Sequence, residues 1–325
     1  MQAWQVHELG DPIDRLVLGD VDGLEPSSGQ LLVDVDAVGL AFPDVLQCRG
    51  EYQVKPPLPF TPGGETSGRV VALGDGVEDF EIGERVVAMG GGLAEQVAVS
   101  AGMAFAVPKS LSQAKAAAVP LNYGTTWFAL HDRAGLAEGE TLLVTGASGG
   151  TGSAAIQLGL AAGARVIAVA GGTDKTAACA ALGAHDVIDH RGVGDLVEEV
   201  RGLTDGRGVD VAYDPVGGDM FQQVRRCMAW DGRLLVIGFV AGIPEIATNH
   251  VLLKNYSVVG VHWGASLGRD PASLARQMAE VMALAEKGVV DPLLHPPYPF
   301  DEAAQALQDI ADRKVVGKVV VDRTA

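Results

Sequence analysis

Six short apolar runs alternate with Ala- and Leu-rich segments between residues 121 and 262. The runs read TLLVTG, ARVIAVA, HDVIDH, VDVAYDPV, RLLVIGFV and YSVVGVHW. Nearly continuous Val, Ile and Leu residues are typical of strands covered on both faces, because a strand with one exposed face alternates apolar and polar positions. The alternation therefore predicts an α/β fold with a doubly wound parallel sheet, with helices on both faces of the sheet.

The flanking segments follow a different pattern. Up to about residue 120, strand-like stretches such as QLLVDVDAVGL are separated by Gly, Pro and acidic turns, which predicts a small β-rich domain. Two predicted helices, over SLARQMAEVMALAEKG and FDEAAQALQDIADRK, precede a closing strand, GKVVVD. A lone strand needs a partner sheet, so we expect it to join the N-terminal strands. The predicted domains are residues 1–120 with 264–325, and residues 121–263.

Charge and cysteine content exclude several classes of protein. The net charge of −17 opposes binding to nucleic acid or to an anionic membrane, since either needs a surplus of Lys and Arg on one face. Three cysteines, far apart and in no metal-ligand pattern, predict neither a disulfide framework nor a four-thiolate site. No targeting signal or apolar window of ~20 residues is present. We expect a cytoplasmic protein whose partner is a small molecule.

A glycine-rich turn, GASGGTG, follows the first of the six predicted strands and opens a helix. Glycine lets the backbone turn tightly and approach a pyrophosphate, while the helix N-terminus supplies free amides and a partial positive charge. A turn that merely packs helix against strand is the alternative interpretation. The sequence predicts a dinucleotide site, formed by Ser148, Gly149, Gly150, Thr151 and Gly152.

The second predicted strand ends in VAGGTDK, with no carboxylate at its tip to accept from the adenosine ribose. Lys175 stands just beyond Gly172, and the end of the third strand adds His190 and Arg191. Cations at this place suit the 2′-phosphate of NADPH, although Lys175 can equally be a solvated helix lysine. We predict NADPH rather than NADH as the cofactor.

TGASGGTG taken alone is similar to the cofactor motif of short-chain dehydrogenases, but that family has it near the N-terminus and needs a Tyr followed four residues later by Lys. No tyrosine of this chain has that spacing. Nearly the whole chain instead resembles the medium-chain dehydrogenase/reductase superfamily, and within it the zinc-independent NADPH:quinone oxidoreductases related to ζ-crystallin. The motifs that carry this resemblance include YQVKPPLPFTPGGETSG, NYGTTWFALHDRAGLAEGETLLVTGASGGTGSAAIQL, GRGVDVAYDPVGGDMF and LLKNYSVVGVHWG.

The resemblance implies a GroES-like domain built from both chain ends around a Rossmann domain, and a homodimer whose sixth strands, near YSVVGV, pair across the interface. Ala41 and Gly64 stand where zinc-dependent members have metal-binding side chains, so we expect no metal. Glu65 remains from that pattern, and we expect it to be a buried acceptor of backbone amides. Family members also commonly have Asn in place of Ala41.

Without zinc to stabilise an alkoxide, hydride transfer to an electron-poor acceptor is the expected chemistry, because a quinone spreads the incoming charge onto an oxygen. The first alternative is reduction of α,β-unsaturated carbonyls or enoyl thioesters. An alternative of another class is a non-catalytic, NADPH-binding structural or sensor protein. NADPH consumption with a panel of quinones and enones would discriminate between these functions.

Matching the family's motifs assigns roles to individual residues. Tyr52 is expected at the substrate mouth and Thr125 near the nicotinamide, with Asn122 and Tyr123 beside it, unless these residues only pack the fold. Backbone groups at the ends of the fourth and fifth strands are expected to hold the nicotinamide carboxamide; these are Val216, Gly238 and Phe239. Arg313, or Lys314 or Lys318 in its place, is expected to reach the adenosine phosphate, although all three can be solvated charges.

Overall fold

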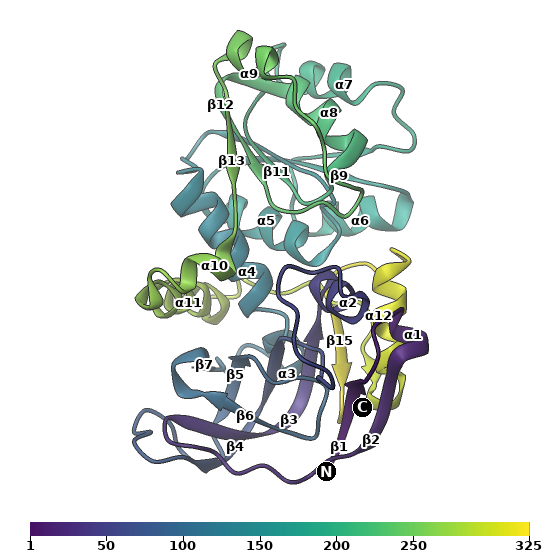
Figure 1. The fold of residues 1–325 in the computed structure, drawn as a ribbon. Helices are drawn as coiled ribbons and strands as arrows, with labels where there is room; N and C mark the ends of the chain where they lie inside the picture. The colour runs from purple at the N-terminus through teal and green to yellow at the C-terminus, as the bar shows by residue number, and fades with distance from the viewer. Residues whose placement is uncertain (325) are drawn as a thin grey trace. The chain divides into compact units, whose positions relative to one another are not determined.

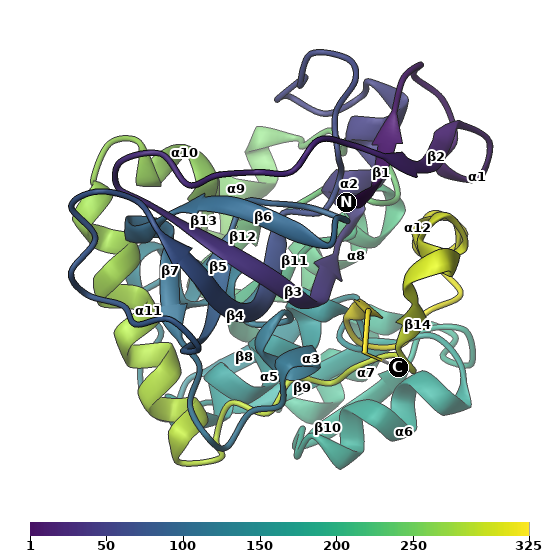
Figure 2. The same ribbon diagram turned by 90° about the horizontal axis from the view of Figure 1, so that it is seen from below.

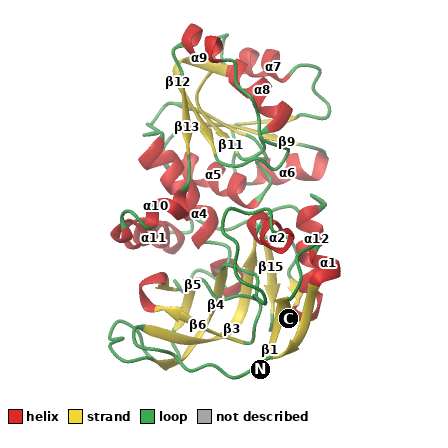
Figure 3. Ribbon diagram, viewed as in Figure 1, coloured by secondary structure: helices red, strands yellow, loops and turns green. Residues whose placement is uncertain are grey.

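The computed structural model describes residues 1–324 of the chain. It divides into two compact units. The first contains Met1–Leu121 and the segment from Leu274 onward, and the second contains Asn122–Ser273. Strands predominate in the first unit, whereas strands and helices alternate in the second (Figure 3). Each unit is described in turn.

The second unit is built on a six-stranded, fully parallel sheet in the order β10-β9-β8-β11-β12-β13. Strands β9, β11, β12 and β13 of this sheet are labelled in Figure 1. The strands are β8 (Thr141–Val144), β9 (Arg165–Ala170), β10 (Asp186–Asp189), β11 (Val209–Asp214), β12 (Met228–Val236) and β13 (Ser257–Gly260). Numbered within this unit, the order is 3-2-1-4-5-6, the dinucleotide-binding arrangement in which the order of the strands reverses between the first and fourth strands. The predicted doubly wound parallel sheet is confirmed.

Helices cover both faces of this sheet. They are α4 (Pro120–Trp127), which begins in the first unit, α5 (Gly150–Ala161), α6 (Thr173–Ala181), α7 (Leu196–Leu203), α8 (Gly218–Cys227), α9 (Thr248–Lys254) and α10 (Trp263–Leu267). Helices α7 and α8 pack on one face in a buried cluster with Leu143 and Ile167. Helix α5 packs on the opposite face, where Gly159 lies against Leu142 and Val166. Burial on both sides explains the nearly continuous apolar runs of the strands.

The first unit contains a seven-stranded sheet in the order β14-β15-β3-β4-β5-β7, with β6 paired to β3, and a separate β1-β2 pair (Figure 2). The strands are β1 (Gln2–Val6), β2 (Leu16–Asp20), β3 (Gln30–Leu40), β4 (Glu65–Leu73), β5 (Arg85–Met89), β6 (Gln96–Ser100), β7 (Ala104–Ala106), β14 (Tyr298–Pro299) and β15 (Val319–Asp322). Strand β15 pairs antiparallel with β3, so that Val319 faces Leu40. The prediction that the closing strand joins the N-terminal strands is confirmed.

The helices of the first unit are short apart from one near the C-terminus. They are α1 (Pro12–Arg15), α2 (Phe42–Arg49), α3 (Gln113–Ala116), α11 (Pro271–Glu286), whose first residues belong to the second unit, and α12 (Ala303–Ala311). Helix α12 contributes Ala303, Ala306 and Leu307 to the core beneath β3 and β15. Within residues 1–324, no helix is both long and apolar enough to cross a membrane.

Candidate functional site

The glycine-rich turn connects β8 to α5 at the carboxyl end of the parallel sheet. Gly146 has a φ of 55°, a left-handed conformation that favours glycine, and its carbonyl oxygen accepts from the amide of Gly149 at 2.9 Å. A Cβ on Gly152 would lie 2.3 Å from that same carbonyl oxygen. A side chain at either position would thus force the turn apart, and helix α5 can begin immediately beyond the strand only because both are glycine.

Helix α5 presents its first amides at this turn. The amide of Ser153 is the first to donate within the helix, to the Gly149 carbonyl at 2.8 Å, so Gly150, Thr151 and Gly152 have no helical acceptor. These three amides and the positive end of the helix dipole form a ready site for an anion. Ser148 is buried beside them, and Gly149 uses its own amide in the turn, so it contributes space rather than a donor.

The loop after β11 meets the glycine-rich turn at the point where the order of the strands in the sheet reverses, between β8 and β11. A Cβ on Gly146 would lie 3.2 Å from Cγ2 of Val216. The Asp214 carboxylate, 1% exposed, accepts from the Thr145 hydroxyl at 2.5 Å and from the amides of Val216 at 3.0 Å and Gly217 at 3.3 Å. Burial raises the pKa of Asp214, and its three donors oppose that shift. Asp214 therefore fixes the shape of the crevice wall.

The predicted carboxamide contacts are not equivalent in the structure. The Val216 amide is bound by Asp214 and the Val216 carbonyl accepts from Ala241 at 2.8 Å, so only the second lone pair of that carbonyl remains for a ligand. The amides of Gly238 and Phe239, by contrast, donate to no protein group within residues 1–324. The loop after β12 therefore offers the free donors at this wall.

The ends of β9 and β10 bring two basic side chains together, those of His190 and Arg191. A Cβ on Gly171 would lie 2.6 Å from Nε2 of His190 and 3.0 Å from Nε of Arg191, so both side chains lie over the glycine pair that follows β9. Asp189 holds this arrangement by accepting from the amides of Gly172 at 3.0 Å and Arg191 at 2.9 Å, and these bonds lower its pKa. Sequence reasoning named the cations but missed Asp189, although it begins the DHR motif.

Lys175 lies in the first turn of α6, three residues after Gly172, which has a φ of 93°. It is half-buried, and Gly172 is the N-cap of the helix. Three of the predicted residues, Gly172, Lys175 and His190, thus lie at the same corner of the sheet.

Helix α4 packs along α5 through polar contacts. The Tyr123 hydroxyl donates to Oε1 of Gln157 at 2.8 Å, and Tyr123 is 1% exposed, so it belongs to the core of the unit rather than to a ligand wall. The Thr126 hydroxyl lies 3.0 Å from the Tyr213 hydroxyl. Thr125, the residue assigned near the nicotinamide, is half-buried on the same helix.

Helices α4 and α10 are in close contact at Gly124 and Trp263. A Cβ on Gly124 would lie 2.3 Å from Cζ2 of Trp263, which is 3% exposed. Trp263 is therefore a core residue that docks α10 against α4.

Tyr52 follows α2 in the first unit and is half-buried. Desolvation, together with the nearby charge of Asp44, raises its pKa, so the phenol is a hydrogen-bond donor at neutral pH. Asp44 is itself buried and accepts from the amides of Ala41 at 2.7 Å and Gly63 at 3.1 Å. Burial raises the pKa of Asp44 to about 6.

Glu65 accepts from the amide of Leu121 at 2.7 Å, as predicted for a buried acceptor of backbone amides. It also forms an ion pair with the Lys318 ammonium, which sequence reasoning missed. The two side chains are 2% and 3% exposed. Lys318 is thus used inside the first unit, and the suggestion that it could replace Arg313 at a phosphate is wrong.

Arg313 lies one residue beyond Asp312, the C-cap of α12, is exposed, and has a φ of 59°. Its neighbour Lys314 forms ion pairs with Asp309 at 3.5 Å and Asp312 at 2.8 Å. Lys314 is therefore held by acidic side chains at the C-terminal end of α12.

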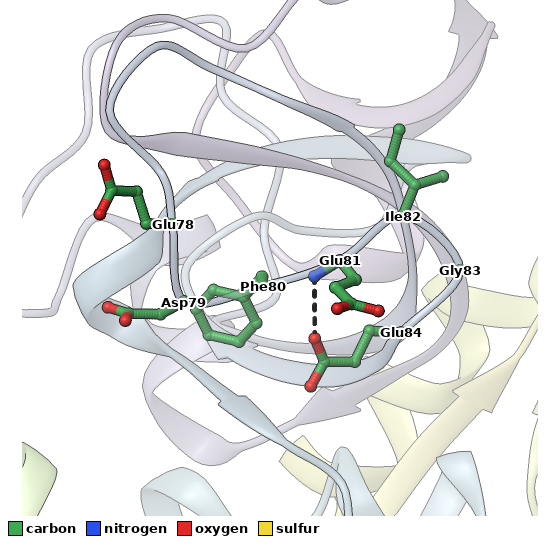
Figure 4. Close-up of a pocket in the computed structure, with 7 residues that line it drawn as sticks. All are labelled: Glu78, Asp79, Phe80, Glu81, Ile82, Gly83 and Glu84. Atoms are coloured by element: carbon green, nitrogen blue, oxygen red, sulfur yellow. Dashed lines mark hydrogen bonds between the residues drawn. The ribbon is translucent and has the colours of Figure 1, made fainter.

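One surface pocket lies apart from all predicted site residues, in the connection between β4 and β5 (Figure 4). It is lined by Glu78–Glu84, and the Glu81 amide donates to Oε2 of Glu84 at 3.0 Å. Its acidic lining disfavours an anionic ligand. Across residues 1–324, no group of three or more His, Cys, Asp or Glu side chains is placed to hold a metal ion.

Comparison with known proteins agrees with this architecture. Residues 27–109 match the family model of the alcohol dehydrogenase GroES-like domain, and residues 150–286 match that of the zinc-binding dehydrogenases. The quinone oxidoreductase-like protein 2 homolog of Nematostella vectensis is 38% identical over 328 residues, covering 99% of this chain and 88% of that protein.

Two solved structures superpose closely. A probable oxidoreductase from Mycobacterium abscessus has a TM-score of 0.91 at 38% identity, covering 99% of this chain and 98% of that one. A mycobacterial protein solved in complex with NADPH has a TM-score of 0.91 at 28% identity, covering 99% of this chain and all (100%) of that one.

The fold and the glycine-lined crevice define a dinucleotide-dependent dehydrogenase or reductase of the medium-chain class. The chain belongs to the quinone oxidoreductase family of the medium-chain dehydrogenase/reductase superfamily. It is an oxidoreductase with a Rossmann domain and a GroES-like domain.

Proposed function

We propose that the protein is an NADPH-dependent, zinc-independent reductase that transfers a hydride to a quinone. One observation carries the choice of cofactor. His190 and Arg191 lie over Gly171 at the end of β9, and the Asp189 carboxylate at this corner already accepts from the amides of Gly172 and Arg191. Cationic donors there favour a 2′-phosphate, whereas a carboxylate would favour the free ribose hydroxyls of NADH. The NADPH complex of a structural relative supports this choice.

The residues present suit a dinucleotide. The amides of Gly150, Thr151 and Gly152 receive the pyrophosphate, and the free amides of Gly238 and Phe239 receive the carboxamide oxygen of the nicotinamide. The reduced nicotinamide, when bound, supplies a hydride from its C4 atom. Thr125 is proposed to lie beside that ring.

The acceptor is proposed to be a quinone, as in the names of the relatives. One quinone oxygen gains negative charge as the hydride adds and is then protonated, so the product is a hydroquinone. The Tyr52 phenol is the proposed donor to that oxygen, since its raised pKa keeps it protonated at neutral pH.

The GroES-like unit supports a reaction without zinc. Ala41 and Gly64 have no side-chain atoms that can bind a metal. Glu65 stands at the start of β4, and the Lys318 ammonium already balances its charge. We propose that this buried cation has the place in charge balance that a metal would otherwise take.

The test is NADPH oxidation in the presence of quinones and of enones, with and without a zinc chelator. We expect quinones to accelerate oxidation, chelation to have no effect, and Tyr52→Phe to lower kcat. Faster reaction with enones or enoyl thioesters than with quinones would establish the alternative substrate class. Tight NADPH binding without acceleration by any acceptor would refute catalysis and favour a cofactor-binding structural or sensor protein.

We also propose a homodimer that pairs along β13. This strand is one of the two edges of the parallel sheet, the other being β10, and three large apolar side chains are highly exposed on elements near it. They are Trp230 at 70%, Leu252 at 78% and Leu253 at 69% exposure. An open strand edge with adjacent apolar side chains is a template for pairing with another chain. Analytical ultracentrifugation tests this, and a concentration-independent monomer mass would contradict it.

We place the protein in the cytoplasm. Its three cysteines are free thiols and are buried, which suits a reducing compartment. Fractionation of the source cells would test this placement, and recovery from an oxidising compartment would contradict it.

A further inference from the structure

Helix α5 holds three amides without a helical acceptor, and a side chain of α4 reaches the same turn. A Cβ on Gly150 would lie 2.5 Å from Nδ2 of Asn122, 3.1 Å from its Cγ and 3.2 Å from its Oδ1. The Asn122 carboxamide therefore lies directly on the first residue of α5. Glycine at position 150 is required for this contact, because any side chain there would displace the carboxamide.

Asn122 is 4% exposed, yet its carboxamide forms no hydrogen bond with any protein group within residues 1–324. The other buried polar side chains of α4 differ in this respect. Tyr123 donates to Gln157, and Thr126 lies within hydrogen-bond distance of the Tyr213 hydroxyl. The Asn122 amide atoms are not among the fully buried side-chain atoms that lack a partner, which in residues 1–324 are Oε1 of Gln113 and Oε1 of Gln308, so the carboxamide keeps access to solvent. An accessible carboxamide that binds no protein group, on an otherwise buried side chain beside the first amides of α5, is placed to bind a ligand there.

The chemistry of that ligand follows from the donors around it. The amides of Gly150, Thr151 and Gly152 and the positive end of α5 all favour an anion. The Asn122 amide adds a neutral donor from a second helix, which suits a phosphate oxygen without adding a cation. In a chain of net charge −17, such neutral donors attract a phosphate group at short range, near the start of α5.

We propose that Asn122 is a cofactor-binding residue whose side-chain amide donates to a pyrophosphate oxygen of the dinucleotide, together with the first amides of α5. This inference rests on the proposed NADPH site and adds to it a side-chain contact from α4. Thr125 lies on the same helix, so a contact between Asn122 and the cofactor would also help to fix the position of Thr125.

The test compares Asn122→Asp and Asn122→Ala with a control on the same helix, Tyr123→Phe. Dissociation constants are measured by calorimetry for NADPH and for adenosine 2′-monophosphate, which has the 2′-phosphate but lacks the pyrophosphate. We expect Asn122→Ala to weaken NADPH binding about 10-fold and Asn122→Asp about 100-fold or more, because a carboxylate repels the pyrophosphate. Binding of the monophosphate should not change in either variant, and Tyr123→Phe should bind both ligands as the wild type does.

Thermal unfolding without ligand separates binding from folding. A carboxylate near the N-terminus of α5 is favourable in the empty protein, so Asn122→Asp should unfold at no lower temperature than the wild type. NADPH binding by Asn122→Asp with wild-type affinity would overturn the inference and leave the proposed function intact. Equal loss of NADPH and monophosphate binding would also overturn it, because it would indicate damage to the fold. A wild-type protein that binds no pyridine nucleotide would refute the proposed function as well.

Discussion

Replacing Lys318 by Met should strongly destabilise the first unit. The ammonium pairs with Glu65, and the two side chains are 3% and 2% exposed, so the substitution leaves a carboxylate buried without its counter-charge. Removing one partner of a buried ion pair costs about 3 to 5 kcal/mol in free energy of unfolding. For a unit of this size, that corresponds to a fall of roughly 6 to 20 °C in the unfolding midpoint.

The loss should depend on pH. Burial already raises the pKa of Glu65 in the native protein, and loss of the ammonium will raise it further. A carboxyl group whose folded pKa lies above its unfolded value stabilises the fold at low pH, and that stabilisation disappears as pH rises through the folded pKa. The stability gap between Lys318→Met and the wild type should therefore be small near pH 5 and large near pH 8.

The matched control is the double variant Glu65→Gln, Lys318→Met. Its neutral amide can still accept from the Leu121 amide, now bonded to Glu65 at 2.7 Å, without leaving a buried charge. We expect it to recover most of the lost stability, since replacing both members of a buried pair is often neutral. Urea unfolding at several pH values measures all three proteins. A loss below about 1 kcal/mol in the single variant, or a double variant no more stable than the single one, would refute the reasoning.

Three other substitutions test separate parts of the molecule. Arg191→Ala should weaken NADPH binding about 10- to 100-fold and leave NADH binding unchanged, because a charge-assisted contact to the 2′-phosphate is lost; equal losses by calorimetry would argue against that contact. Gly124→Ala should cost about 1 to 3 kcal/mol by overpacking against Trp263, whose Cζ2 atom would lie 2.3 Å from the new Cβ, and urea unfolding with tryptophan fluorescence should report it. The pKa of Asp44 is raised from 3.8 to about 6, so wild-type stability should fall as pH rises across that interval. Asp44→Asn should show a flatter stability profile there, and an unchanged profile would exclude Asp44 as its source.

The sheet of the second unit was predictable because its strands are buried on both faces. After Arg165, every residue of the run ARVIAVA is buried, which distinguishes it from the alternating strands of the first unit. The closing strand was also predictable, since no other strand-like run lies near GKVVV in the sequence; the two-residue β14, which pairs with it, gives no such signal. Strand register was not, because β15 meets β3 across nearly the whole length of the chain, and pairing at that separation leaves no local signal.

In the candidate site, too, features set by nearby residues were predictable and features that join distant residues were not. Glycines 146, 149 and 152 act within one turn, so their spacing reveals their role. Lys318 and Glu65 are 253 positions apart, and neither residue alone indicates that the other neutralises it. Asp214 was missed for a different reason: a strand-terminal aspartate reads as a solvated charge until three donors are found around it.

The proposed site can bind an anionic cofactor in an acidic protein because most of its donors to the pyrophosphate are neutral amides. With a net charge of −17, long-range attraction cannot bring a dinucleotide to the protein, so binding must depend on contacts at short range. The helix amides and Asn122 are neutral donors, and they act on the pyrophosphate without changing the overall field. Arg191 and His190 lie together at the corner near Gly171, and we propose that this corner binds the 2′-phosphate. Affinity and cofactor choice are thus assigned to different groups, and substitutions at Asn122 and at Arg191 should change them separately.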